Sequence, residues 1–131
     1  MSDDAAALIK QAYDVRRTGD AEGSLQLYRR AADAAGDDPP LRAHCLRHIG
    51  DLERESGRVA AADAALIEAE ALYRSVVSDT LSLANTVRLR ALTGGSNDLW
   101  REARILYEQA GKVTGLDLSV AMEECDAHLG E

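Results

Sequence analysis

The chain has 131 residues, of which 29% are charged, and its formal net charge is −8. Proteins that bind nucleic acids or anionic membrane surfaces use clustered Lys and Arg to attract phosphate groups, so this acidic composition argues against both classes of partner. A chain of this length is predicted to form one domain.

The predicted location follows from what the sequence lacks. No apolar run approaches the roughly 20 residues that a membrane-spanning helix needs. The first residues carry acids where a secretory signal peptide carries basic residues, which predicts a cytoplasmic protein. In that compartment Cys45 and Cys125 are predicted to be buried free thiols, with a disulfide between them as the alternative.

Turn and capping signals divide the chain into seven predicted helices. Apolar residues recur at intervals of three and four, and no segment alternates apolar and polar residues with a period of two. Gly residues that can end a helix stand beside Asp or Ser residues that can cap the next one. The predicted breaks lie at Gly19-Asp20, residues 36–40, Ser56-Gly57, Ser78-Asp79, residues 94–98 and residues 115–117. The pattern predicts an all-α fold.

One spacing occurs in the second, fourth and sixth predicted helices: a small residue, a large residue four positions later, and an alanine three positions after that. The copies are offset by 62 − 24 = 38 and 103 − 62 = 41 residues. A period near 40 in a helical chain predicts stacked helix–turn–helix units, because one unit cannot bury its own apolar face. The copies are Ser24–Tyr28–Ala31, Ala62–Leu66–Ala69 and Ala103–Tyr107–Ala110. Five residues before the small residue of each copy stands Gly19, Gly57 or Asp98, respectively.

The last predicted helix has a single apolar stripe, formed by Leu118, Met122, Cys125 and Leu129. The acids Glu123, Glu124 and Asp126 are expected mostly on its outer face, and His128 largely outside the stripe. A helix of this kind suits the open end of a helical stack, which would otherwise expose its core. It is predicted to be a cap. The alternative is a dimerisation or partner helix.

Few residues in the sequence point to catalysis or metal binding. His44 and His48 share a helix face, but zinc sites usually need three or four protein ligands, and the sequence does not clearly supply the others. Gly94-Gly95-Ser96-Asn97 lacks the lysine of a phosphate-binding loop. Cys125 is surrounded by acids, which oppose a reactive thiolate. The prediction is a non-enzyme without a cofactor or metal.

The repeated spacing resembles the tetratricopeptide repeat family. The second copy matches best, with Leu46, Ile49 and Gly50 on the first helix of its unit, although Glu53 stands where the family prefers an aromatic residue. The proline that closes each repeat in the family is missing. The resemblance implies a right-handed superhelical stack of antiparallel helix pairs, with repeats at about 5–36, 39–76 and 80–113 and a capping helix at about 117–130.

In the family, certain positions on the first helix of each unit line a concave groove. Arg47 and Arg88 are equivalent because 88 − 47 = 41, and Arg16 and Arg54 are equivalent because 54 − 16 = 38. Guanidinium groups suit carboxylates, so the implied groove favours an acidic ligand. The alternative is that these arginines pair with neighbouring acids such as Asp14, Asp51 and Glu53. The implied groove carries Tyr13, Arg16, His44, Arg47, Asp51, Arg54, Asn85 and Arg88.

The predicted function is a non-catalytic protein–protein interaction module that binds a peptide or protein segment in this groove. Some members of the family bind a partner's C-terminal carboxylate. Asn85 and Arg88 are suited to that role, whereas Ile9 and Tyr13 are not the polar residues of a full clamp. An extended acidic peptide or a helix are the other ligands considered. The alternative functions are a small-molecule or metal-sensing repeat protein and a structural homo-oligomer, and the oligomeric state stays open.

Overall fold

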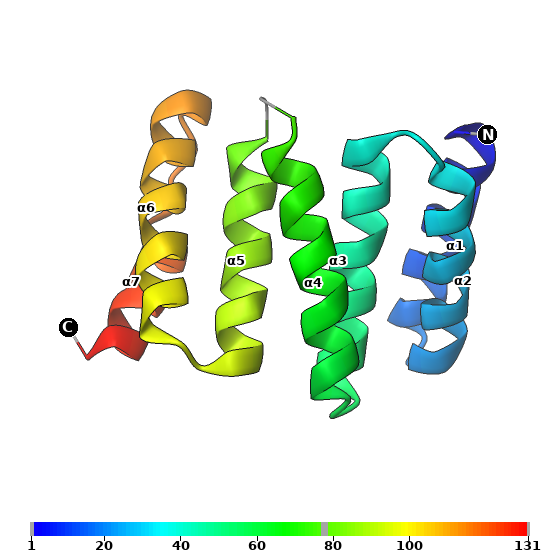
Figure 1. Cartoon of the computed structure of the whole chain (residues 1–131), viewed down its shortest axis with the longest axis horizontal. Helices are drawn as coiled ribbons and strands as arrows, with labels where there is room; N and C mark the ends of the chain where they lie inside the picture. The colour runs from blue at the N-terminus through cyan, green and yellow to red at the C-terminus, as the bar shows by residue number, and fades with distance from the viewer. Residues whose placement is uncertain (1, 77–78, 131) are drawn as a thin grey trace. The chain divides into compact units, whose positions relative to one another are not determined.

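The computed structural model describes residues 2–76 and 79–130, which form seven helices and no strand (Figure 1). The predicted all-α fold class is therefore confirmed. The chain divides into two compact units, Met1–Val76 and Val77–Glu131. The first unit holds α1 (Ser2–Arg17), α2 (Ala21–Ala35), α3 (Pro39–Glu55) and α4 (Val59–Arg74), and the second holds α5 (Thr80–Gly94), α6 (Asn97–Thr114) and α7 (Ser119–Leu129).

Short polar side chains begin most of these helices, as the sequence predicts. The Asp20 carboxylate accepts a hydrogen bond from the Gly23 backbone N–H at 2.8 Å, and Asp79 accepts one from Ser82 at 3.0 Å. Each bond satisfies one of the backbone donors that the first turn of a helix leaves unpaired. Such caps fix where α2 and α5 begin, and so the register of each helix against its neighbour.

The small residue of the repeated spacing faces the preceding helix. In the first copy the Ser24 hydroxyl donates to the Ala12 carbonyl of α1 at 2.8 Å, and both residues are buried. A larger side chain there would separate α1 from α2. Every member of the three copies is buried, which explains the spacing as the set of positions where the two helices of a unit meet.

The third copy differs from the first two in its turn. In the first two copies the glycine five residues before the small residue has a positive φ. In the third copy Asp98 stands at that place, and Gly95 takes the left-handed conformation instead, with φ of +69°. Ser96 then caps the helix. α6 therefore begins at Asn97, two residues before the predicted start at Leu99, and Asp98 lies in its first turn. Trp100 follows in the same first turn, and its side chain is buried.

The core of the second unit is closed by α7. Cys125 is fully buried, and Leu118, Met122 and Leu129 pack against the cluster that contains Trp100. The predicted stripe is therefore the face that α7 buries. The expectation that its acids mostly point outward is wrong in two cases, because Glu124 and Asp126 reach Arg88 and Arg104 with contacts of 2.6 Å each.

His128 lies outside the apolar stripe, as predicted, and is exposed. Its ring stacks on Trp100, with 3.9 Å between the ring centroids and 6° between the ring planes. The last turn of α7 is therefore held against the first turns of α6 by a ring contact that the apolar stripe does not include.

Glu53 explains one departure from the family pattern. Its carboxylate is buried in the first unit, where it accepts hydrogen bonds from Arg58 at 2.7 Å and from Arg29 at 3.4 Å. Two half-exposed arginines thus compensate the buried charge, and α2 and the start of α4 are tied to α3. The buried ion pair takes the place of the aromatic residue that the family prefers.

Cys45 and Cys125 are both buried and both free thiols. Burial raises the pKa of the Cys45 thiol to about 11.

None of the described helices is long and apolar enough to cross a membrane.

Candidate functional site

Most of the predicted groove residues of the first unit lie on α3. This helix positions His44, Arg47, Asp51 and Arg54 at intervals of three and four residues, which places them along one face. Residues 41–55 hold their orientation because the opposite face of α3 packs on α2 and α4 through Cys45, Ile49 and Leu52, which are buried. Arg16 reaches this face from α1.

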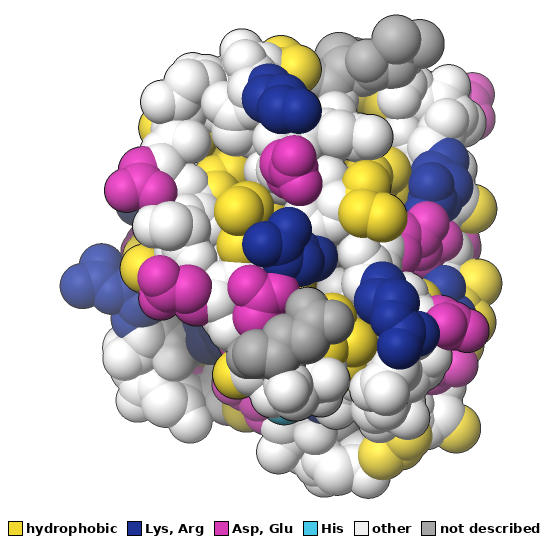
Figure 2. Space-filling model, turned by 90° about the vertical axis from the view of Figure 1, so that its left-hand side faces the viewer, with side chains coloured by type: hydrophobic (Ala, Val, Ile, Leu, Met, Phe, Trp, Pro, Cys, Tyr) yellow, Lys and Arg dark blue, Asp and Glu magenta, His cyan; other side chains and the backbone are white. Residues whose placement is uncertain are grey.

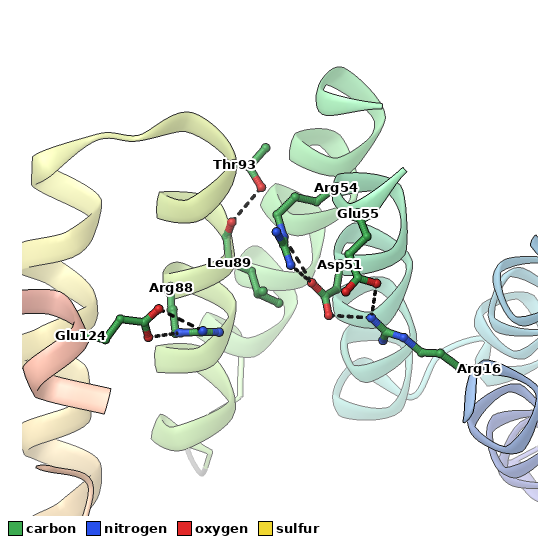
Figure 3. A network of polar contacts seen from close by, with 8 residues as sticks. All are labelled: Arg16, Asp51, Arg54, Glu55, Arg88, Leu89, Thr93 and Glu124. Atoms are coloured by element: carbon green, nitrogen blue, oxygen red, sulfur yellow. Dashed lines mark hydrogen bonds and ion pairs between the residues drawn. The ribbon is translucent and has the colours of Figure 1, made fainter. Parts of the chain in front are cut away.

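A network of ion pairs joins α1 to α3 (Figure 3). Arg16 donates from Nη2 to Asp51 at 2.9 Å and to Glu55 at 2.7 Å, and Arg54 donates to the other Asp51 oxygen at 2.7 Å. Burial alone would raise the pKa of Asp51, but the hydrogen bonds from Arg54 and Arg16 hold it below its ordinary value. The carboxylate therefore stays charged and neutralises part of the positive charge on this face.

Arg47 differs from its neighbours because it has no carboxylate partner within the described part of the chain. Its Nε is buried without a hydrogen-bond partner, and its Nη2 lies 3.4 Å from His44 Nδ1. A buried N–H group without a partner is costly, and guanidinium groups bind carboxylates well. Arg47 is therefore the residue of this face that is best prepared to accept an anion.

Two imidazole rings lie near Arg47, and one of them, His44, contacts it. His48 stacks parallel on the ring of Tyr28, with 4.7 Å between centroids, and meets His44 edge-on at 4.6 Å. Burial, and then the nearby His44, Arg47 and Arg16, lower the pKa of His48 to about 3. His48 is therefore neutral at physiological pH, and it serves as a stacked platform rather than as a cation or an acid.

Acidification is expected to destabilise the first unit through His48. An imidazole whose pKa is lowered by folding binds a proton more readily in the unfolded chain, so stability is lost as the pH falls below about 6.5, and the loss continues down to about 3. Its upper limit is about 1.4 kcal/mol per pH unit. Urea denaturation at pH 7 and pH 5 measures it. His48→Phe keeps the ring stack without a titrating group, and it should flatten this dependence. Parallel pH profiles for the two proteins would contradict the assignment.

Tyr13 occupies a separate position on α1. Its side chain is 54% exposed, and the guanidinium of Arg17 lies 5.8 Å from its ring centroid. None of its described contacts joins it to the Arg16 network. Of the predicted residues of the first unit, the structure thus connects Arg16, Asp51 and Arg54 with one another, and His44 with Arg47.

The two predicted residues of the second unit lie on α5. The Tyr107 hydroxyl donates to Asn85 Oδ1 at 2.6 Å, and Arg88 makes two hydrogen bonds to the Glu124 carboxylate, at 2.6 and 3.1 Å. Both residues line an open hollow of about 490 Å³ within this unit. Arg88 is therefore already bound to a carboxylate of its own chain, as Figure 3 shows.

Of the three acids considered as alternative partners of the groove arginines, only Asp51 pairs with them, namely with Arg16 and Arg54. Asp14 pairs with Lys10 at 3.1 Å, and the buried Glu53 pairs with Arg29 and Arg58 instead of with the groove arginines. The sequence did not reveal the contributions of Glu55 and Glu124. Helical spacing does place Glu55 on the same face as Asp51, but no signal within one helix predicts that α7 brings Glu124 to Arg88.

Metal coordination by His44 and His48 would require further ligands. Among the described residues, no group of three or more His, Cys, Asp or Glu side chains is arranged to hold a metal ion. In the structure His48 is engaged in stacking between Tyr28 and His44.

No protein-family model matches this chain, and no curated protein matches it either. A solved structure that resembles it is that of the first TPR of Spaghetti (RPAP3) bound to the HSP90 peptide SRMEEVD. The TM-score is 0.68 at 16% sequence identity, and the match covers 99% of this chain and 98% of that chain. At this identity the likeness defines the fold. The chain has the fold of a tetratricopeptide repeat domain.

Proposed function

We propose that this protein is a peptide-binding interaction module, and that its first unit anchors an acidic segment on Arg47. One observation carries the choice of residue: Arg16, Arg54 and Arg88 each pair with a carboxylate, whereas Arg47 has no such partner among the described residues. The Arg47 side chain is only partly buried, so a ligand carboxylate would bind its guanidinium group from the exposed side.

The charge of the α3 face supports an acidic ligand. Three guanidinium groups, those of Arg16, Arg47 and Arg54, stand there with two carboxylates, those of Asp51 and Glu55, while the whole chain carries a net charge of −8. The acidic remainder repels anions that do not reach this face. The similar solved domain was determined with the peptide SRMEEVD, in which three of the last four residues are acidic.

Replacing Arg47 with Ala is expected to weaken binding of fluorescein-labelled SRMEEVD at least tenfold. A hydrogen bond to a charged group contributes about 1.5–3 kcal/mol, and a factor of ten corresponds to about 1.4 kcal/mol. Fluorescence anisotropy at low salt measures the affinity, and added salt should weaken the wild-type complex. The peptide SRMQQVN, which lacks the three acidic side chains, should bind far less tightly than SRMEEVD.

Lys10→Ala is the matched control, because it removes one positive charge from the same unit at a side chain that is 79% exposed and paired with Asp14. It should leave the affinity within about twofold, as expected for an exposed pair. If Arg47→Ala and Lys10→Ala bind the acidic peptide equally well, Arg47 is not the anchor. If SRMQQVN binds as tightly as SRMEEVD, the protein does not recognise the acidic side chains of the segment.

A further inference from the structure

In the second unit, α7 places its own carboxylate on the arginine that the sequence assigned to ligand binding. Glu124 accepts from Arg88 Nε at 2.6 Å and from Nη2 at 3.1 Å, so both carboxylate oxygens are engaged. The side chains of this pair are about one third exposed, 33% for Arg88 and 31% for Glu124. The pair therefore lies at the surface, where a ligand reaches it.

The space next to this pair has the dimensions and chemistry of a small binding site. Apolar side chains of α7 and of the connection before it form one wall, and Asn85 with the Tyr107 hydroxyl forms another. Val120 is 79% exposed, although it is aliphatic. Figure 2, which faces α6 and α7, shows hydrophobic side chains interspersed with charged ones of both signs on this side. The apolar wall consists of Leu118, Val120 and Ala121.

We propose that this hollow is a carboxylate site whose internal occupant is Glu124, and that a ligand with one carboxylate on a small aliphatic group displaces it. The exchange replaces the two hydrogen bonds between Arg88 and Glu124, because the ligand carboxylate accepts both of them while Glu124 turns to water. The aliphatic group then covers Leu118 and Val120. Burial of this apolar surface favours the ligand over Glu124, which has no aliphatic group to place there.

Charge restricts the ligand to a single carboxylate. Asp117 also lines the hollow, and a hydrogen bond from Ser119 lowers its pKa, so it is ionised at neutral pH. A second negative group on the ligand would meet Asp117 and the released Glu124. This ligand class deepens the proposed function, on which it rests for the idea that the protein recognises carboxylates, and it differs from the acidic segment expected at Arg47.

Titrating N-acetylleucine into the full-length protein tests the site, with the side-chain Nε–H signal of Arg88 followed by NMR. Glu124→Gln weakens the internal competitor, so it should bind N-acetylleucine about fivefold more tightly than the wild type. Arg88→Ala should remove binding in both backgrounds, as followed by the backbone signals of Val120 and Ala121. N-acetylleucinamide, which lacks the carboxylate, and acetate, which lacks the aliphatic group, should both bind more weakly than N-acetylleucine.

Asp126→Asn is the matched control, because it removes the other ion pair of α7, with Arg104, and leaves Glu124 in place. If both variants bind N-acetylleucine more tightly by the same factor, weaker packing of α7 is enough to raise the affinity, and the role of Glu124 is overturned. Unchanged or weaker binding in Glu124→Gln, with native fluorescence of Trp100, would overturn it as well. Binding of SRMEEVD by Arg47→Ala is measured separately, so failure at either site is told apart from failure at the other.

Discussion

Truncation of the chain after Gly115 is expected to unfold the second unit. It deletes α7, whose Cys125 is fully buried and whose Leu118, Met122 and Leu129 pack against the cluster around Trp100. Fully burying one side chain of this kind contributes about 1.5–3 kcal/mol, and a whole small domain is stable by only about 5–15 kcal/mol. What remains is the helix pair α5 and α6, which cannot bury its own apolar face.

The single tryptophan of the chain reports this directly. Trp100 is 2% exposed and stacks on His128, so the truncated protein should show a red-shifted emission maximum. Circular dichroism should show a loss of helix larger than the 11 residues of α7. Truncation after Gly130 is the control, because it keeps all of α7. A shorter protein that keeps the native emission, the helicity of α5 and α6 and an unchanged melting temperature would refute the capping role.

Contacts within and between successive helices were predictable from the sequence, because they repeat. The spacing of Ser24, Tyr28 and Ala31 recurs in the later units, and these residues are buried where the helices of a pair meet. Asp20 and Asp79 stand directly before the helices they cap, so their roles follow from local chemistry. The fold class depends on these short-range rules.

The state of the candidate site was not predictable, because it depends on which side chain meets which across helices. Equivalent positions placed Arg47 and Arg88 together as groove residues. In the structure, however, Glu124 forms an ion pair with Arg88, whereas none of the carboxylates of the described residues pairs with Arg47. The partner of Arg88 lies 36 residues away in the sequence, on a helix that follows no repeat spacing. Repeat arithmetic identifies equivalent positions, but not the partners of their side chains.

Replacing Gly50 with Ala is expected to destabilise the first unit, although alanine favours helices. A Cβ at this position would lie 2.5 Å from Leu66 Cγ and 2.6 Å from Leu66 Cδ2, and Leu66 is fully buried. Either Leu66 must leave its position in the core or α3 must move away from α4. Overpacking of this kind costs about 1–3 kcal/mol, against a gain of up to about 1 kcal/mol from helix propensity. Gly50→Val should cost more, because valine adds two methyl groups at the same point.

Gly111→Ala in α6 is the control that separates the steric overlap with Leu66 from the higher helix propensity of alanine. A Cβ there would meet only ordinary contacts, 3.5 Å to the Leu116 carbonyl oxygen and 3.9 Å to Leu118 Cδ1, so this variant should be as stable as the wild type or more stable. Urea denaturation of the three variants measures the difference. Since α3 carries Arg47, Gly50→Val should also weaken binding of SRMEEVD under conditions where the first unit begins to unfold, without touching the ligand. Equal stability of Gly50→Ala and Gly111→Ala would show that Leu66 gives way at no cost, and that the close approach of α3 to α4 does not need glycine.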